Sequence, residues 1–545
     1  MPDSHDLLAR ARAFLEQDVD PDDRAELESL LKSGDREELA ARFAGPLTFG
    51  TAGIRGILGA GESRINRSLV LRVTFGLVSY LLEVVPDAAR RGIVIARDGR
   101  HRSDVFQKDA AAVVTARGVR VHWIEGPNPT PLLAFGVKQL GAAAGIVITA
   151  SHNPPEYNGY KVYWENGAQI IPPVDAGIGA AIAEAPPANA IPREENSTLV
   201  AEVDLADDYL DAVNGLVLSR EADISSFAVA YSALHGVGQQ LFLEAFGRRG
   251  FKKLFPVFEQ AVPDGNFPTV HFPNPEEPGA LELVLGEAKR QGCPLVLVND
   301  PDADRLGAAV RDGEGRYTAL SGNEIGVLLA SYILARTREP KPLVVSTVVS
   351  SRMVERMCSE LSVRYEDTLT GFKWIANEAM RLEAAEGCRF VFGFEEALGY
   401  TVGTVVRDKD GISAGLLLAE MAAGLVENGE TLLDELERLR ERYGHFVSRQ
   451  RSFTLTGEEG ARTIADAMRR LRDEPLGQIA SERVRFHVRD GVLIYDVEAG
   501  GRIAVRPSGT EPKLKFYLEL VGADAASRLD AVERDLLRAA GLDSL

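Results

Sequence analysis

Short apolar runs that alternate with helical segments constrain the fold of this chain more than any other feature. The run RGIVIARD at 91–98 and the run AGIVITA at 144–150 have the length of buried strands. A helix is expected between them, from about Ser103 to Arg117. Repetition of strand, helix and strand in this order is typical of an α/β fold with a parallel sheet.

The same rhythm returns twice further along the chain. A second set of strands begins near 226 and ends at 294–300, and a third begins at 342–350 and ends at 389–396. The Pro- and Ala-rich stretch 184–197 indicates a linker before the second set. The last hundred residues are richer in strands. We therefore expect three α/β domains with parallel or mixed sheets and one smaller α+β domain, at 1–200, 201–320, 321–440 and 441–545.

Composition narrows the classes of partner and the compartment. The 545 residues carry a net charge of −19, which repels nucleic acid and anionic lipid. The three cysteines form no CxxC pair, and the N-terminus is polar and acidic, so a cytoplasmic protein is expected. No apolar stretch is long enough to span a bilayer. If the substrate is an anion, its binding site needs a local excess of positive charge from Arg, Lys or a metal ion.

The segment TASHNPPEYNGYKVY at 149–163 is the most specific motif. Ser151 follows an apolar strand directly, and ligands gather at the carboxyl ends of parallel strands. A serine hydroxyl is a weak nucleophile that needs activation or prior phosphorylation. His152 and Lys161 are close enough in sequence to take part. The alternative is a polar turn with an incidental serine.

The segment LVLVNDPDADRLG at 295–307 places three carboxylates after another apolar strand, on Asp300, Asp302 and Asp304. Oxygen ligands at alternate positions suit Mg²⁺, and three like charges packed together without a cation would be costly. Arg305 could orient a carboxylate or a phosphate. One alternative is a turn rich in Asp, and another is a phosphatase of the haloacid-dehalogenase type with an Asp nucleophile.

Further segments add positive charge and sugar-binding groups. RPSGTEPKLKFYLE at 506–519 offers a guanidinium, hydroxyls, open backbone and lysines that could cradle a phosphate. FGFEEALGY at 392–400 places two carboxylates after a strand, where they could bind sugar hydroxyls. Three other turn-rich segments carry one cation each: FGTAGIRG (49–56) with Arg55, LTGFKWI (369–375) with Lys373, and RDKDG (407–411) with Lys409.

These segments, in this order, resemble those of the α-D-phosphohexomutase superfamily, which includes phosphoglucomutases, phosphomannomutases and phosphopentomutases. The resemblance runs from about Phe49 to Glu519. In length, and in LTGFKW and GFEEALGY, the chain is most similar to the phosphoglucomutase-2-like branch. The resemblance implies four domains around a central cleft, with one key loop from each domain.

The resemblance also implies a role for each matching residue. Ser151 would carry the phosphoryl group and complete a Mg²⁺ site with Asp300, Asp302 and Asp304, while Arg55, His152 and Lys161 would assist the transfer. The remaining matches would bind the substrate; they are Arg305, Gly371, Lys373, Glu395, Glu396, Lys409, Arg506, Ser508, Gly509, Thr510 and Lys515. The implied reaction interconverts sugar 1- and 6-phosphates, foremost those of glucose, through a sugar 1,6-bisphosphate. A monomer or small homo-oligomer is expected.

One position departs from the family pattern. Many phosphoglucomutases have Glu-Glu-Ser in the sugar loop, and Ala397 stands at the serine position here. One hydroxyl contact to the sugar is therefore missing or comes from elsewhere. Pentose phosphates, mannose phosphates and the synthesis of glucose 1,6-bisphosphate stay open as alternatives. A sugar-phosphate sensor without catalysis is an alternative of a different class.

Overall fold

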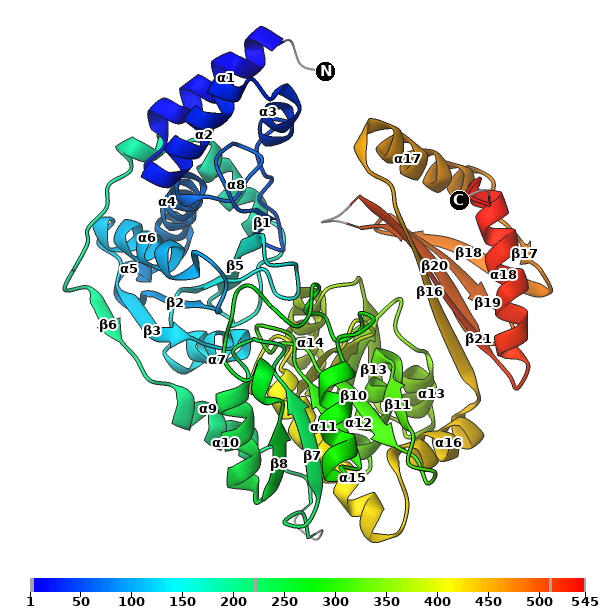
Figure 1. Cartoon of the computed structure of the whole chain (residues 1–545). Helices are drawn as coiled ribbons and strands as arrows, with labels where there is room; N and C mark the ends of the chain where they lie inside the picture. Colours follow the sequence, from blue (N-terminus) through cyan, green and yellow to red (C-terminus); the bar gives the residue numbers. More distant parts are fainter. Residues whose placement is uncertain (1–3, 220–222, 509–511, 544–545) are drawn as a thin grey trace. The chain divides into compact units, whose positions relative to one another are not determined.

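The computed structural model describes residues 4–219, 223–508 and 512–543 (Figure 1). The chain forms two compact units. The first comprises Met1–Ala319 and Gly399–Gly424, and the second comprises Leu320–Leu398 and Leu425–Leu545.

Three helices open the first unit: α1 (Ser4–Gln17), α2 (Pro21–Ser33) and α3 (Arg36–Arg42). Helix α2 begins after Asp20, whose side chain caps it, and ends at Gly34, whose φ of 70° suits a residue without Cβ. Arg102 of the following domain forms ion pairs with Asp20 and Asp23. These helices therefore have their own apolar core and are also held to the domain by charge; the core is Leu7, Ala11, Leu27, Leu39, Phe43 and Ala60.

The first sheet has the strand order β1-β5-β4-β2-β3-β6. Strands β4, β2, β3 and β6 are parallel, while β5 is antiparallel to both β4 and β1. The parallel strands confirm the α/β prediction, and the two antiparallel pairings of β5 make the sheet mixed. The strands are β1 (Ile54–Ile57), β2 (Ile93–Arg97), β3 (Val121–Pro127), β4 (Ala144–Ile148), β5 (Tyr157–Trp164) and β6 (Val200–Glu202), and the helices are α4 (Arg67–Val84), α5 (Ala88–Arg91), α6 (Ser103–Ala116), α7 (Thr130–Gln139) and α8 (Val174–Ala183).

The stretch 184–197, where the composition indicates a linker, packs on the first domain. It contains a short 3-10 helix, η1 (Ala188–Ala190), and buries Ala188 and Ile191 against residues of α4 and α6. The chain then adds β6 to the first sheet. The composition shows that this stretch is rich in proline, but it does not show that Ala188 and Ile191 between the prolines pack on α4 and α6.

The second sheet has the order β11-β10-β9-β7-β8, with β9, β7 and β8 parallel and β10 antiparallel to β9. Every residue of β9 is buried, which agrees with its unbroken apolar sequence. The strands are β7 (Ala228–Ser232), β8 (Lys253–Pro256), β9 (Leu295–Val298), β10 (Gly307–Arg311) and β11 (Tyr317–Leu320), and the helices are α9 (Ala206–Asn214), α10 (Gln239–Arg249), η2 (Phe258–Gln260) and α11 (Glu282–Gln291).

A later segment of chain returns to the first unit. It contains β15 (Gly399–Val402) and most of α15 (Gly411–Glu427). Arg305 and Gly399 form an isolated antiparallel bridge, and the amide of Gly411 donates to the carbonyl of Ala303 at 3.2 Å. The loop between β15 and α15 is thereby placed beside the loop that follows β9.

The second unit contains a parallel run of strands, in which β12 lies between β13 and β14. Ser321 and Glu324 form a capping box at the first helix of this unit. The strands are β12 (Pro342–Thr347), β13 (Arg364–Thr368) and β14 (Arg389–Glu395), and the helices are α12 (Gly322–Leu334), α13 (Met353–Glu360), α14 (Phe372–Glu386) and α16 (Leu432–Tyr443).

The C-terminal part of the second unit is an antiparallel sheet of order β16-β21-β20-β19-β18-β17, and its α+β character confirms the prediction. Val348 and Leu369, which follow β12 and β13, pack on Ile494 and Tyr517 of this sheet. Its elements are β16 (Phe446–Thr454), α17 (Gly457–Asp473), β17 (Gln478–Ile479), β18 (Glu482–Arg489), β19 (Val492–Val497), β20 (Gly501–Pro507), β21 (Lys513–Val521) and α18 (Ala525–Ala540).

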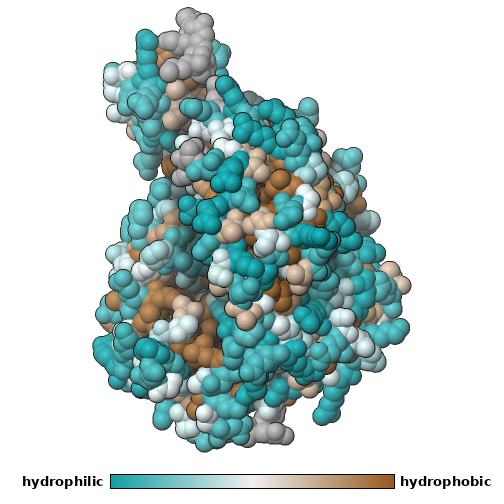
Figure 2. All heavy atoms as spheres, turned by 90° about the vertical axis from the view of Figure 1, so that its right-hand side faces the viewer, coloured by the Kyte–Doolittle hydropathy of each residue, from teal (hydrophilic) through white to brown (hydrophobic). Residues whose placement is uncertain are grey.

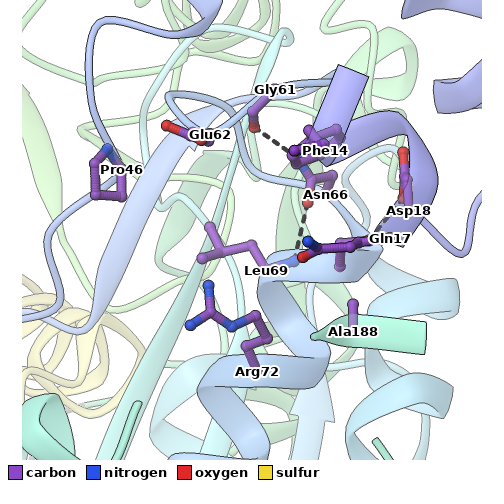
Figure 3. A pocket seen from close by; sticks show the side chains of 12 residues that line it. Phe14, Gln17, Asp18, Pro46, Gly61, Glu62, Asn66, Leu69, Arg72 and Ala188 are labelled. Atoms are coloured by element: carbon purple, nitrogen blue, oxygen red, sulfur yellow. Dashed lines mark hydrogen bonds between the residues drawn. The ribbon is translucent and has the colours of Figure 1, made fainter. Parts of the chain in front are cut away.

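The surface agrees with the composition. Hydrophilic residues predominate on the face drawn in Figure 2, as expected for a chain with 80 acidic and 61 basic residues. Within the described part of the chain, no helix combines the length and apolar character needed to cross a membrane.

Candidate active site

Ser151 lies in the loop between β4 and β5, at the carboxyl end of β4. Its side chain is almost fully buried, and its φ of 52° is in the left-handed region, which is uncommon for a residue with a Cβ. The hydroxyl donates to Asp300 Oδ2 at 2.8 Å and lies 3.2 Å from His152 Nδ1. The backbone therefore holds the serine away from solvent with its hydroxyl against a carboxylate.

Asp300, Asp302 and Asp304 follow β9 and are completely buried. Ala303 adopts a left-handed φ of 54°, and the amide of Arg305 donates to Asp300 Oδ1 at 3.0 Å. This turn gathers the three side chains, and one oxygen from each lies within 4.8 Å of the others. The sequence prediction that these carboxylates converge is confirmed.

Two lysines from distant segments face the carboxylates. Lys161 Nζ, on β5, lies 2.7 Å from Asp302 Oδ2 and 3.1 Å from Asp304 Oδ2. Lys409 Nζ lies 3.3 Å from Asp304 Oδ2 and 3.1 Å from Asp408 Oδ1. The structure thus groups Lys409, which we expected to bind substrate, with Lys161 around the acidic cluster.

Burial and neighbouring charges set the protonation of this cluster. Burial and the charges of Asp302 and Asp304 raise the pKa of the Asp300 carboxyl well above its ordinary value. Burial acts on Asp302 in the same direction, but the charge of Lys161 together with hydrogen bonds from Lys161 and Thr130 outweighs it and holds the pKa of Asp302 below its ordinary value. Desolvation and the positive charge of Arg305 lower the pKa of His152 well below its ordinary value, so its imidazole is neutral near pH 7.

The donor set fits a hard divalent cation. Among the described residues, Asp302 Oδ1 and Asp304 Oδ1 are buried without a hydrogen-bond partner. Each belongs to a carboxylate whose other oxygen accepts from Lys161, so one oxygen of each side chain is left for a ligand. Three carboxylates with no nitrogen or sulfur ligand are the chemistry that Mg²⁺ prefers.

Two arginines border the serine and the carboxylates. Arg55, on β1, donates to Asn153 Oδ1 at 2.6 Å and so contacts the loop that carries Ser151. Arg305 Nε lies 4.0 Å from Asp300 Oδ2 and 3.9 Å from Asp304 Oδ1. Together with the two lysines, these guanidinium groups supply the local positive charge that an acidic protein needs to bind an anion.

Within the second unit, four of the residues predicted to bind substrate lie at one edge of the parallel strands. Glu395 ends β14, and Gly371 precedes α14 directly after β13, with Lys373 in the first turn of that helix. Glu396 Oε2 accepts from Thr347 Oγ1 at 3.3 Å, across the same edge. The carboxyl ends of parallel strands explain why these segments meet.

The predicted phosphate residues lie on the last hairpin. Arg506 on β20 and Lys515 on β21 are direct cross-strand partners, and the amide of Ser508 donates to the carbonyl of Lys513 at 2.8 Å. Arg506 Nε is buried and has no hydrogen-bond partner among the described residues. Gly509 and Thr510 lie outside the described residues, so their predicted contacts stay predictions.

Sequence reasoning missed two groups that hold the cluster together. Thr130 Oγ1, at the start of α7, donates to Asp302 Oδ2 at 2.7 Å. Asp408 Oδ2 accepts from Tyr163 Oη at 2.6 Å and from Gln169 Nε2 at 2.7 Å, and thereby anchors the segment that carries Lys409. The segment PNPTP at 127–131, which contains Thr130, and the segment RDKDG both have the composition of turns, but only the tertiary structure shows which turn meets which carboxylate.

Comparison with known proteins identifies the family. Four domain models of the phosphoglucomutase/phosphomannomutase family match the chain in order: alpha/beta/alpha domain I at 46–188, alpha/beta/alpha domain II at 207–313, alpha/beta/alpha domain III at 321–443 and the C-terminal domain at 458–536. The chain belongs to this family. Its members are phosphomutases, so the protein is an isomerase that transfers a phosphoryl group within a sugar phosphate.

Relatives from three organisms are similar over most of their length. A "Probable phosphomannomutase" of Haemophilus influenzae is 37% identical, over 84% of this chain and 94% of the relative. A "Probable phosphoribomutase" of Schizosaccharomyces pombe is 36% identical, over 92% and 91%. A "Glucose 1,6-bisphosphate synthase" of Mus musculus is 33% identical, over 96% and 91%. All three relatives are named for reactions of sugar phosphates, but the sugar in the name differs from one relative to the next.

Proposed function

We propose that this enzyme interconverts glucose 1-phosphate and glucose 6-phosphate through a phosphorylated Ser151 and a glucose 1,6-bisphosphate intermediate. The 2.8 Å hydrogen bond between Ser151 Oγ and Asp300 Oδ2 carries the proposal. It puts the hydroxyl of Ser151 beside three buried carboxylates that suit Mg²⁺, which supports a nucleophile role for this serine. A serine in an incidental turn has no reason to be buried in this way.

The proposed transfer conserves the phosphoryl group. The bond between phosphorus and Ser151 Oγ breaks while a bond forms to the free hydroxyl of the sugar monophosphate, and the hydroxyl proton passes to a nearby base. The resulting bisphosphate turns over in the site and returns its other phosphoryl group to Ser151. Mg²⁺ bound by Asp300, Asp302 and Asp304 would neutralise charge on the phosphoryl group during its transfer.

The basic residues divide the remaining roles. Burial lowers the pKa of Lys161, but Asp302 and Asp304 outweigh it and raise that pKa, so Lys161 suits a cation or proton donor rather than a base. The neutral His152 imidazole would accept a proton, and its distance of 3.2 Å from Ser151 Oγ supports this role. Arg55 and Arg305 would hold the transferring group.

The remaining predicted residues would bind the rest of the substrate. Arg506, Ser508 and Lys515, with Gly509 and Thr510, would hold the phosphate that does not react. Glu395, Glu396, Gly371 and Lys373 would contact the sugar, and Lys409 of the first unit is a further candidate. Because the bisphosphate reverses its orientation, one phosphate site has to accept either end of the molecule.

Glucose is the first choice of sugar because the mouse relative is named for glucose 1,6-bisphosphate. Pentose phosphate is the second candidate, favoured by the phosphoribomutase name of one relative and by Ala397 in the sugar loop. A panel of glucose, mannose, glucosamine, ribose and deoxyribose 1-phosphates would rank the sugars. A rate on ribose 1-phosphate above that on glucose 1-phosphate would overturn the choice of glucose.

The phosphoserine is tested by Ser151→Ala. After incubation with glucose 1,6-bisphosphate, the unchanged enzyme should gain one phosphoryl group on the peptide that contains Ser151, and the variant should gain none and lose mutase activity. Ser197→Ala, at another buried serine of the first unit, should behave like the unchanged enzyme. Full activity in Ser151→Ala, or a phosphoryl group on Asp300 as in an Asp-nucleophile phosphatase, would contradict the proposal.

Two properties complete the proposal. Sugar 1,6-bisphosphate would act as the activator that first phosphorylates Ser151. The three buried cysteines form no disulfide, which supports a reducing compartment such as the cytoplasm. We propose a monomer or small homo-oligomer, which light scattering of the purified protein would distinguish.

A further inference from the structure

The loop that carries Ser151 has an unusual form of support. Residues 151–157 run from the carboxyl end of β4 to the start of β5, and Pro154 and Pro155 within it lack an amide N–H. Ser151 also has a left-handed φ. Such a conformation persists only where surrounding groups impose it.

One buried guanidinium gathers the carbonyls of this loop. Arg100 Nη2 donates to the carbonyl of Ser151 at 2.6 Å and to that of Asn153. Arg100 Nη1 donates to the carbonyl of Pro154 at 2.8 Å and to that of Tyr157 at 3.1 Å. Four backbone acceptors spread over the whole loop therefore converge on one side chain.

Arg100 is itself held from several sides. Its side chain and that of Asp98 are each 1% exposed, and Arg100 Nε lies 3.3 Å from Asp98 Oδ2. Asp98 Oδ1 accepts from the Arg100 amide at 3.0 Å and from Ser103 Oγ at 2.9 Å. The ring of Phe267 lies 4.9 Å below the guanidinium. A charge buried this fully, with a partner and a ring against it, has little freedom to move.

We infer that Arg100, oriented by Asp98, is the positioning residue that imposes the conformation of the phosphoserine loop and so aims the phosphoryl group of Ser151. The inference rests on the proposed phosphoryl-carrier role of Ser151 and adds to it. Arg100 contacts the backbone of the loop and acts on the reaction only through that backbone. It is therefore distinct from Arg55 and Arg305, which border the reacting groups.

A lysine could not replace this arginine. The guanidinium presents several N–H donors in a rigid plane from separate nitrogens, whereas an ammonium has all its donors on a single atom. Lysine at position 100 could keep the positive charge and bind one or two of the carbonyls. It could not hold both ends of the loop at once, so Ser151 would sample other orientations.

The test compares Arg100→Lys with Arg67→Lys in the full-length enzyme. Arg67 is a matched control because its guanidinium makes a two-pronged pair with Asp109, at 2.7 and 2.8 Å, elsewhere in the same domain. Measurements are kcat and KM for glucose 1-phosphate, the thermal midpoint, and the phosphorus NMR resonance of the phosphoserine. Arg100→Gln is the substitute if Arg100→Lys does not fold, and Arg100→Ala is assayed with and without added guanidinium.

For Arg100→Lys we expect kcat to fall at least tenfold, KM to stay within about threefold, and the phosphoserine resonance to shift or broaden. Added guanidinium should raise kcat of Arg100→Ala and not that of Arg67→Lys. A kcat of Arg100→Lys within twofold of the unchanged enzyme would overturn the inference. So would a loss that comes with an unchanged resonance and the same drop in thermal midpoint as Arg67→Lys.

The two proposals fail separately. If Ser151→Ala keeps its activity, the phosphoserine mechanism is wrong. If Ser151→Ala is inactive and Arg100→Lys is fully active, the mechanism stands and only the role of Arg100 is wrong.

Discussion

At the scale of single residues, charge compensation dominates the site. Asp300, Asp302 and Asp304 have no exposed surface, and buried carboxylates are costly without partners. Lys161 and Lys409 supply two positive charges within 3.3 Å of the cluster. One oxygen of Asp302 and one of Asp304 still lack a partner among the described residues. The cluster is therefore arranged for one more cation.

We predict that Asp302→Asn weakens the response to Mg²⁺ at least about tenfold, because the amide keeps the size of the carboxylate and removes one charged ligand. The measurement is the Mg²⁺ concentration that gives half-maximal mutase activity, together with the rise in thermal midpoint on addition of Mg²⁺. Glu314→Gln, in the exposed turn between β10 and β11, is the control. Equal half-maximal concentrations in Asp302→Asn and the unchanged enzyme would refute the assignment.

At the scale of elements, the loop after β7 supports the loop that carries the carboxylates. Leu234 and His235 both have left-handed φ values, of 47° and 59°. The amide of Val237 donates to the carbonyl of Pro301 at 2.9 Å. A Cβ on Gly236 would lie 2.3 Å from the Cα of Pro301, which is closer than any real contact. The sequence LHGVG at 234–238 is therefore a turn that packs closely against the loop that carries the carboxylates.

We predict that Gly236→Ala lowers the free energy of unfolding by about 1–3 kcal/mol, as overpacking does, and also weakens the Mg²⁺ response because Pro301 has to shift. Gly286→Ala in α11 is the matched control, since its Cβ would meet nothing within 4 Å. That helical substitution should instead stabilise by about 0.5–1 kcal/mol. Denaturant titration measures the free energy of unfolding of both variants, and Mg²⁺ titration measures their activation by the metal. Equal values for the two variants would argue against the close contact between Gly236 and Pro301.

At the scale of the molecule, ion pairs attach the N-terminal helices to the first domain. Asp23 on α2 is almost fully buried and pairs with Arg102 at 2.7 Å. Burial raises the pKa of Asp23 from 3.8 to about 6, although Arg102 opposes the shift. The folded protein therefore binds a proton between about pH 4 and 6 that the unfolded chain releases. Stability from this group is present at low pH and is lost as the pH rises through about 6.

We predict that the thermal midpoint of the unchanged protein rises relative to that of Asp23→Asn as the pH falls from 7 to 4, because only the carboxyl can take up the proton. Thermal unfolding of both proteins in matched buffers measures the difference. Asp104→Asn, at an exposed position of α6, should show a constant difference from the unchanged protein. A constant difference for Asp23→Asn as well would show that the pKa of Asp23 is not raised.

Some of the fold and the site could be predicted because the signals are local. Ser151 and Asp300 each follow an unbroken apolar run, and both runs form fully buried strands, β4 and β9. The composition of 184–197 indicated a linker, but proline content says nothing about the surface on which Ala188 and Ile191 pack. Local composition predicts where the chain turns, whereas the burial of a residue depends on the distant segments that pack against it.

The sequence by itself therefore determined the α/β fold and the positions of Ser151 and the three carboxylates at strand ends, since each depends on residues close together in the chain. The tertiary structure alone decided which distant side chains meet them. Thr130 and Lys409 reach the carboxylates, and Arg100 reaches the carbonyls of the serine loop, from segments far away in the sequence. Such contacts depend on strand order and loop packing, which have no signature in local periodicity.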